Sequence, residues 1–292
     1  MKKLSFFFVK FFIAEFSILP FRVIYFFSDV SFFLMYYLAR YRRKVVRKNL
    51  ELSFPEKSSG EIITLEKKFY HHLCDIMLES LKAFSMNDKE MISRYWITNP
   101  ELINDYFLKE KSVIVVTGHY NNWEWGSIAA CLQLKHHPIG FYKPIKNECI
   151  DNYMRGNRER NGAKVVSITK TSESFQLYKS EPALFLMVAD QSPSKIELAH
   201  WRPFLNRETA FLHGPEKHAR LNNLPVVYAR INKVKRGYYS VAFQLLTENP
   251  AEVPEEGITG LFAEALEKTI RRQPEYWLWS HKRWKHERIH DL

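Results

Sequence analysis

The first forty residues are strongly apolar and aromatic, and the apolar positions between Val23 and Leu38 recur at helical spacing. Charged residues interrupt this segment at Lys10, Glu15, Arg22 and Asp29. The longest run without charge is therefore shorter than the roughly 20 residues that a helix needs to span a bilayer. The basic start resembles a signal peptide, but no small-residue cleavage site follows the apolar stretch. The pattern predicts an uncleaved helix or helical hairpin.

A basic cluster follows at once and consists of Arg40, Arg42, Arg43, Lys44, Arg47 and Lys48. Aromatic side chains beside a run of cations are typical of a segment that lies in the cytoplasmic interface of an anionic membrane. The alternative is an aromatic core helix with a solvated basic end. An arm that binds nucleic acid is disfavoured, because such arms are polar and basic rather than rich in phenylalanine. We expect residues 1–40 to anchor the protein to a membrane.

The pattern changes at Ser53-Phe54-Pro55-Glu56, where a new segment begins. Apolar positions from Glu61 to Phe84 predict a long amphipathic helix, and a proline precedes a shorter helix at 101–109. Strands and helices then alternate. We predict strands at 113–116, 165–168, 183–189, 226–231 and 239–245. We predict helices at 123–134, 148–160, 171–180, 209–222 and 257–272.

This alternation indicates an α/β fold with a mixed, mostly parallel central sheet flanked by helices. Apolar residues make up 46% of the chain and aromatic residues 15%, which excludes a disordered or collagen-like protein. The sequence contains no internal repeat and no low-complexity linker. We therefore expect residues 41–292 to form one domain, which carries the chemistry.

Charge and cysteine content narrow the class of partner and the compartment. The chain has 43 Lys and Arg against 32 Asp and Glu, a net charge of +11, which favours an acidic partner such as nucleic acid, anionic lipid or an acidic carrier protein. Its three cysteines, Cys74, Cys131 and Cys149, are too few for a disulfide framework and lack metal-ligand spacing. A reducing compartment is the simpler interpretation.

The sharpest local feature is the segment from Val116 to Gly126, where a predicted strand gives way to a helix. Open α/β sheets bind their ligands at this end of their strands. His119 and Glu124 are five residues apart, so they share no face of a regular helix. They can meet only if His119 lies on the turn and Glu124 in the first helical turn, with Asn121 as N-cap. The alternative is structural: Glu124 caps the helix and His119 is an ordinary turn residue.

A histidine beside a carboxylate suits proton transfer from a hydroxyl, because imidazole titrates near neutral pH and the carboxylate fixes its tautomer. The chain has no Gly-x-Ser-x-Gly nucleophile motif. Its adjacent histidine pairs, 71–72 and 136–137, do not match zinc-binding motifs, so we expect no metal. Covalent catalysis by Cys131 or Cys149 is a minor alternative.

Five short blocks occur in order along the chain, at residues 119–124, 142–162, 190–209, 214–226 and 274–285. The first reads His-Tyr-Asn-Asn-Trp-Glu, the second starts with Tyr-Lys-Pro, the third with Asp-Gln, the fourth with Gly-Pro, and the fifth with Pro-Glu-Tyr-Trp. With these blocks the chain resembles the late lipid A biosynthesis acyltransferases, the lauroyl/myristoyl branch of the bacterial lysophospholipid acyltransferase superfamily. The resemblance covers nearly the whole chain.

The resemblance implies a glycerolipid acyltransferase-like fold and an enzyme at the cytoplasmic face of the bacterial inner membrane. It implies transfer of a fatty acyl chain from an acyl carrier protein thioester to a hydroxyl of a lipid A precursor, with no cofactor. His119 would be the general base and Glu124 would hold its imidazole. The implied substrate-binding residues are Asn122, Tyr142, Arg158, Asp190 and Gln191.

Two departures from the family pattern leave the acceptor open. Lys143 replaces an arginine in the second block, and Ser192-Pro193 replaces an acidic residue and glycine in the third. The acceptor could instead be a lysophospholipid or an amino-acid-based lipid, and a rival of another class is a non-enzymatic membrane-surface binding protein. Arg158 could equally face solvent on a charged helix, and Asp190 could only cap its loop. The tryptophans of the last block are expected in the core rather than on a ligand.

Overall fold

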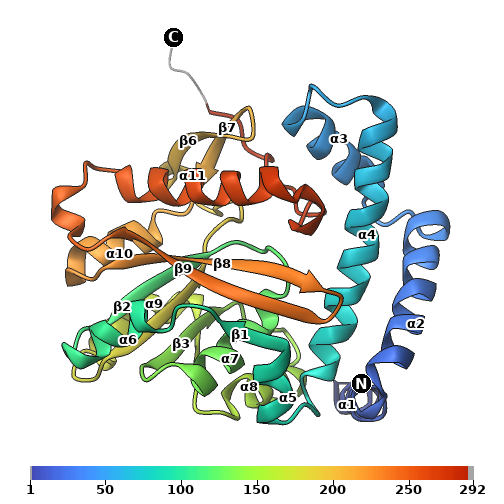
Figure 1. Ribbon diagram of the computed structural model, residues 1–292, viewed down its shortest axis with the longest axis horizontal. Coiled ribbons are helices and arrows are strands. Elements are labelled where there is room, and N and C mark those ends of the chain that lie inside the picture. The colour runs from blue at the N-terminus through green and yellow to red at the C-terminus, as the bar shows by residue number, and fades with distance from the viewer. Residues whose placement is uncertain (1, 289–292) are drawn as a thin grey trace.

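The computed structural model describes residues 2–288, and a seven-stranded sheet forms its centre (Figure 1). Its strands are β1 (Tyr95–Ile97), β2 (Val113–Thr117), β3 (His137–Tyr142), β4 (Lys164–Ser167), β5 (Ala183–Val188), β8 (Val226–Lys235) and β9 (Tyr238–Thr247). Their order across the sheet is β1-β9-β8-β2-β5-β3-β4. Strands β6 (His200–Phe204) and β7 (Arg207–Phe211) form a separate antiparallel ribbon.

All neighbouring strands of the large sheet are parallel except β8 and β9, which form an antiparallel hairpin. Helices precede the first strand and connect most of the strands. They are α3 (Arg43–Ser53), α4 (Ser59–Lys82), α5 (Asp88–Arg94), α6 (Glu101–Leu108), α7 (Gly126–Gln133), α8 (Glu148–Glu159), α9 (Thr171–Leu177), α10 (Gly214–Asn222) and α11 (Gly257–Arg272). Short 3-10 turns are η2 (Trp123–Trp125), η3 (Ile168–Lys170), η4 (Ile196–Leu198), η5 (Pro250–Glu252) and η6 (Pro274–Tyr276). The predicted mixed, mostly parallel α/β architecture is confirmed.

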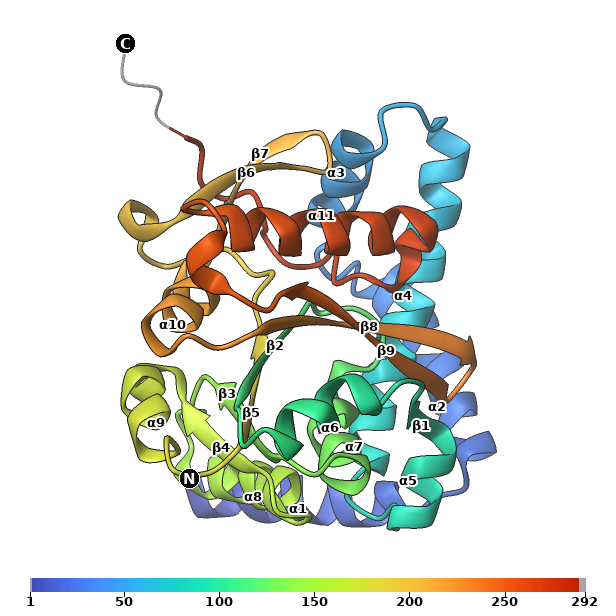
Figure 2. The ribbon, with the colours of Figure 1, turned by 60° about the vertical axis from the view of Figure 1, so that its left-hand side comes forward.

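Strand β2 is buried on both faces of the sheet, as its unbroken run of β-branched residues predicts. Ile114 and Val116 belong to a core that includes Leu266 of α11. Val113 and Val115 belong to a second core that includes residues of α6 and α7. Figure 2 shows α11 on one side of the sheet and α6 and α7 on the other. The carboxyl end of β2 is thereby held rigidly between two helical layers.

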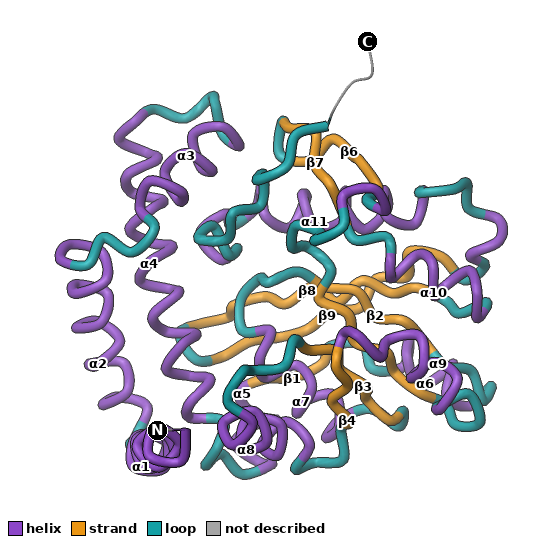
Figure 3. The backbone as a smooth tube through the Cα atoms, turned by 180° about the vertical axis from the view of Figure 1, so that it is seen from behind, coloured by secondary structure: helices purple, strands orange, loops and turns teal. Residues whose placement is uncertain are grey.

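At the amino terminus, α1 (Lys2–Ile18) leads into α2 (Phe21–Phe33) and a short π-helical continuation, η1 (Leu34–Leu38). Figures 1 and 3 show α2 alongside α4, next to the end of the β8–β9 hairpin. Helix α1 contacts α4 and α8. By length and composition, the 18 residues Phe21–Leu38 could cross a membrane.

Apolar side chains of this N-terminal segment point outward. Those at least half exposed are Phe7, Phe8, Phe11, Phe12, Ile18, Phe26, Phe33 and Leu38. Contiguous exposed apolar surface of this kind marks an interaction site in a folded protein. The alternative of an aromatic core helix does not fit these side chains.

Two predicted helices differ from the structure. Residues 209–222 divide into strand β7 and helix α10, because Thr209 and its neighbours pair with β6. Residues 123–134 begin as the 3-10 turn η2 before α7 starts at Gly126. Strand β3 was not predicted from the pattern, since it includes Pro138 and Gly140, which are poor strand formers.

Candidate active site

Two neighbouring parallel strands bring the candidate residues together. Thr117 at the end of β2 lies opposite Val188 at the end of β5, and each strand is followed two residues later by a polar side chain, His119 and Asp190. Gly118 permits their close approach, because a Cβ there would lie 2.8 Å from Leu266 Cδ1 and 3.0 Å from Asp190 Oδ2. The site therefore forms at the carboxyl edge of the sheet, as the fold class predicts.

The His119 imidazole is hydrogen-bonded through both ring nitrogens. Its Nδ1 lies 2.6 Å from Asp190 Oδ1, and its Nε2 lies 3.0 Å from Gln191 Nε2. A carboxylate only accepts, so these partners assign the proton to Nδ1 and leave Nε2 with the lone pair. The backbone N–H of His119 also donates to Asp190 Oδ2 at 2.8 Å. His119 is thus oriented as a base whose basic atom is Nε2.

Asp190 is buried, being 2% exposed, and is surrounded by donors. The Trp277 indole N–H donates to Oδ2 at 2.7 Å, besides the two contacts from His119. Burial alone would raise the pKa of Asp190, but the charge of His119 and these hydrogen bonds outweigh it and lower the pKa below its ordinary value. Asp190 therefore stays ionised at neutral pH and can stabilise an imidazolium.

Glu124 lies elsewhere than expected. Its Oε2 accepts from Arg158 Nη2 at 2.9 Å, and no hydrogen bond or ion pair among residues 2–288 joins it to His119. The physical reason is that Glu124 sits on η2 and faces α8, which carries Arg158, whereas β5 delivers Asp190 directly to the imidazole. The orienting role expected of Glu124 is therefore performed by Asp190 in this structure. Glu124 and Arg158 remain partly exposed, at 31% and 26% of their side chains.

Two asparagines hold the turn between β2 and η2. Asn122, not Asn121, is the cap, and its Oδ1 accepts from Trp125 N at 3.2 Å. Asn121 adopts the left-handed conformation (φ 53°) and donates to the carbonyl of Ile231. Asn122 is fully buried, and its amide nitrogen donates to Glu79. It is thus a structural residue, which corrects the expectation that Asn122 binds substrate.

The last block of the sequence completes the turn. Tyr120 pairs with Trp277 in an antiparallel bridge, and the N–H of Leu278 donates to the carbonyl of His119 at 3.1 Å. Trp277 and Trp279 are buried, as expected for core residues. Trp277 has a second role that the sequence did not indicate, because its indole N–H binds Asp190.

Two cavities are each lined by a residue that contacts His119. One of about 310 Å³ is mostly apolar, and its lining residues include Trp123, whose ring centroid lies 5.0 Å from that of His119, and the pair Glu124 and Arg158. The other, of about 450 Å³, is lined by Gln191, Arg42 and His281 among others. Leu73, Met77 and Leu278 line both cavities. The two cavities therefore adjoin each other close to His119.

Tyr142 ends strand β3 and supports α8 rather than touching His119. Its hydroxyl donates to Asp151 Oδ2 at 2.8 Å, and Asp151 Oδ1 accepts from the N–H of Ile145 at 2.7 Å. Both contacts fix the start of α8, the helix that carries Arg158. Tyr142 is therefore one step removed from the cavities.

Among residues 2–288, no group of three or more His, Cys, Asp or Glu side chains could hold a metal ion. The three cysteines are free thiols. Burial raises the pKa of Cys131 to about 11, which leaves little thiolate at neutral pH. The geometry at His119 thus provides an oriented imidazole close to two adjoining cavities.

Comparison with known proteins decides the family. The sequence model described as bacterial lipid A biosynthesis acyltransferase matches residues 1–286. The chain belongs to this family. Among its relatives is the lipid A biosynthesis palmitoleoyltransferase of Escherichia coli (strain K12), 23% identical over 247 residues, which are 84% of this chain and 79% of the relative. The lipid A biosynthesis lauroyltransferase of the same organism is 24% identical over 247 residues, which are again 84% of this chain and 79% of the relative. Membership in the family supports acyl transfer as the reaction.

Proposed function

We propose that this acyltransferase moves a fatty acyl chain from an acyl carrier protein thioester to a hydroxyl of a lipid A precursor. The observation that carries the proposal is the His119–Asp190 pair, oriented at the edge of the sheet close to two adjoining cavities. The names of the relatives supply the acceptor class, since they are lipid A lauroyl- and palmitoleoyltransferases. Thioester donors suit the site because they are already activated, so no acyl-enzyme is needed.

In the proposed mechanism, His119 Nε2 takes the proton of the acceptor hydroxyl as that oxygen attacks the thioester carbonyl carbon. Asp190 stabilises the imidazolium that forms, since it is ionised and 2.6 Å from Nδ1. When the tetrahedral adduct collapses, the C–S bond breaks and His119 returns the proton to the leaving thiolate. The acceptor hydroxyl must displace the Gln191 amide, which occupies the place beside Nε2.

In the proposed site Glu124 pairs with Arg158 instead of holding the His119 imidazole. Their ion pair lines the cavity of about 310 Å³, whose mostly apolar lining suits a hydrocarbon chain. We assign this cavity to the acyl chain and Arg158 to the phosphate of the carrier arm or of the lipid, because a guanidinium matches phosphate geometry. Tyr142 contributes through the start of α8.

Residues 1–40 are proposed as the membrane anchor, lying flat in the interface rather than crossing it. The middle of the apolar stretch is bonded to the domain, because Asp29 is 2.6 Å from Arg236 on the β8–β9 turn. A helix whose centre binds a water-facing hairpin cannot place that centre in the bilayer core. Its outward aromatic side chains fit an interface at the cytoplasmic face of the inner membrane, where acyl carrier protein is present.

The test is acyl transfer by the purified protein. Acyl carrier protein loaded with a fatty acid is incubated with a lipid A precursor, with a lysophospholipid and with an amino-acid-based lipid in separate reactions. Mass spectrometry should find the mass of one acyl group added to the lipid A precursor.

The His119→Ala variant is the control and should lose at least about 10³-fold in turnover while keeping its fold, since it removes the base. Transfer only to another lipid would change the acceptor in the proposal. Near-normal turnover by folded His119→Ala would exclude the mechanism, and no transfer at all by the wild type would favour a membrane-surface binding protein.

A further inference from the structure

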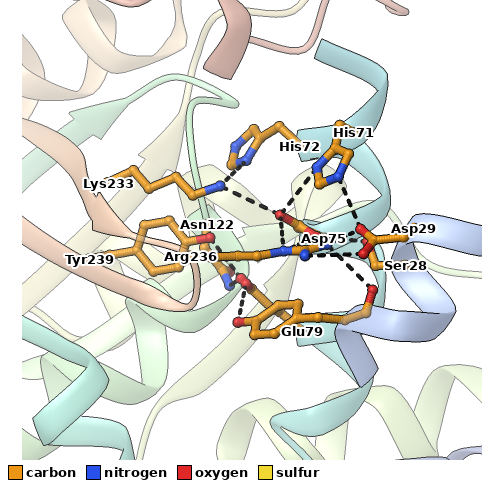
Figure 4. A network of polar contacts seen from close by, with 11 residues as sticks. Ser28, Asp29, His71, His72, Asp75, Glu79, Asn122, Lys233, Arg236 and Tyr239 are labelled. Atoms are coloured by element: carbon orange, nitrogen blue, oxygen red, sulfur yellow. Dashed lines mark hydrogen bonds and ion pairs between the residues drawn. The ribbon is translucent and has the colours of Figure 1, made fainter. Parts of the chain in front are cut away.

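A buried carboxylate on α4 joins three parts of the fold. Glu79 is fully buried and accepts three side-chain hydrogen bonds. Asn122 of the active-site turn and Tyr239 of β9 each donate to Oε2 at 2.8 Å, as Figure 4 shows, and Tyr25 of α2 donates to Oε1 at 2.9 Å. A buried carboxylate is stable only when donors surround it, so these three contacts depend on one another.

Glu79 forms hydrogen bonds with two residues at η2. Its side chain holds Asn122, the cap of η2, and its backbone carbonyl accepts from the Trp125 indole N–H at 3.1 Å. Asn122 follows His119 by three residues, on the same turn. Glu79 of α4 thus holds the end of the turn that carries His119.

One helical turn before Glu79, Asp75 fixes α2 on α4. Its Oδ1 accepts from Ser28 at 2.7 Å and from Arg236 Nη2 at 2.6 Å, and Arg236 also pairs with Asp29 of α2 at 2.6 Å. Figure 4 shows these side chains together, between α2 and the hairpin. This seating of α2 brings Tyr25 within reach of Glu79. Beside the face that carries Tyr25, Ser28 and Asp29, α2 exposes Phe26 and Phe33.

We propose that Glu79 is a positioning residue for acyl transfer and that, through Tyr25, it makes the geometry at His119 depend on the seating of α2 against the domain. The proposal rests on the proposed function, because the helix thus connected to the site is the proposed membrane anchor. Displacing α2 removes the Tyr25 hydroxyl, one of the three donors to Glu79. The loss of this hydrogen bond weakens the placement of the Glu79 carboxylate beside Asn122. The enzyme is expected to be most active when α2 is seated.

Three single variants test this proposal in the full-length protein. Tyr25→Phe removes the donor on α2 and leaves the apolar face intact. Glu79→Gln keeps one acceptor oxygen, and Glu79→Ala keeps none. Tyr178→Phe is the matched control, since it deletes a phenol hydroxyl that makes no hydrogen bond within residues 2–288 and lies beyond α9, away from Glu79. Thermal unfolding checks that each variant is folded.

Steady-state kinetics provides the first readout. Tyr25→Phe is expected to lower kcat about tenfold and Glu79→Gln by about 10- to 100-fold, with KM within about twofold, because misplacing a catalytic group by about 1 Å costs on the order of 100-fold. Glu79→Ala should lose more than Glu79→Gln. Tyr178→Phe should match the wild type. Variants whose folded fraction keeps the wild-type kcat would overturn the proposal and leave Glu79 a purely structural residue.

A second readout needs no substrate. The proton between His119 Nδ1 and Asp190 should give a low-field NMR signal in protein with ¹⁵N-labelled histidine, and it should shift in Tyr25→Phe and Glu79→Gln but not in Tyr178→Phe. An unchanged signal together with unchanged kcat overturns the proposal. If the wild type transfers no acyl group but the signal shifts, the proposed function fails and the connection from α2 to His119 stands.

Discussion

The N-terminal helices and the sheet domain use the same aromatic side chains in opposite ways. Phe7, Phe8 and Phe11 on α1 are each more than half exposed, whereas Phe185 and Phe211 in the domain are at most 1% exposed. Yet the two regions are not independent bodies, because the polar side of α2 enters the buried network around Asp75 and Glu79. Aromatic content alone therefore does not distinguish the N-terminal helices from the sheet domain. The difference lies in which surface each phenylalanine faces.

This comparison implies that chemistry and membrane attachment can be separated by mutation on the outer surfaces, but not at the seam where α2 meets α4. Changes in the domain should alter turnover and leave vesicle binding intact. Changes on the outer face of α1 should do the reverse.

The largest effect is expected at the two carboxylates near His119. Asp190→Asn should lower kcat by about 10²- to 10⁴-fold, because an amide cannot hold the Nδ1–H tautomer or stabilise the imidazolium. Glu124→Gln should cost less and act mainly on KM, because it weakens only the pair with Arg158. Kinetics of both variants under the same conditions checks the order. A larger loss of kcat in Glu124→Gln would restore the His119–Glu124 pairing expected from sequence.

The apolar face should dominate membrane binding. Replacing Phe7, Phe8 and Phe11 together by serine should weaken partitioning into vesicles by on the order of 10²-fold, at about 1 kcal/mol for each partly inserted ring. Turnover of a detergent-dispersed acceptor should remain near that of the wild type. Sedimentation with vesicles measures the first quantity. Unaltered sedimentation would mean that another surface binds the membrane.

The seam should give the protein a pH-dependent stability. Burial, assisted by the nearby charge of Asp75, raises the pKa of Glu79 from 4.5 to about 7. Because the folded-state pKa is the higher one, its favourable contribution is complete below about pH 4.5 and is lost as the pH rises through about 7. The stability of the wild type relative to Glu79→Gln should fall by roughly 2–3 kcal/mol between pH 4.5 and 8. Urea denaturation across this range is the measurement, and a pH-independent difference contradicts the assignment.

The smallest effect is expected from the basic cluster, whose members differ. Arg43 and Arg47 bind the buried Glu66, and Arg42 donates to the carbonyl of Ser280. Lys44 and Lys48 are exposed. Lys44→Gln with Lys48→Gln should weaken binding to anionic vesicles by at most about tenfold at low salt, at about 1 kcal/mol or less per charge. Equal binding to neutral and anionic vesicles would assign these lysines to the acyl carrier protein instead.

Much of this site could be predicted from local patterns. The short β-branched strand before His119 and the apolar strand before Asp190 are visible in the sequence, and both polar residues follow strands. What the sequence could not supply is that β2 and β5 are neighbours although β3 and β4 lie between them along the chain. Spacing favoured Glu124 because it is close in sequence, whereas sheet order places Asp190 closer in space.

Other features were invisible for similar reasons. The role of Trp277 depends on the bridge between Tyr120 and a segment more than 150 residues later. Asn122 and Glu79 meet only because α4 packs against the turn. The exposure of one face of α1 follows from its contacts with α4 and α8, which helical periodicity does not specify.

The bridge between Tyr120 and Trp277 joins residues that leave the ribosome at very different times during synthesis. His119 is synthesised early. The indole N–H that binds Asp190 and the amide N–H that binds the His119 carbonyl belong to Trp277 and Leu278, which are synthesised near the end. The apolar amino-terminal helices leave the ribosome more than 200 residues earlier. A nascent chain therefore presents its apolar amino-terminal helices well before the hydrogen bonds around His119 and Asp190 can be completed.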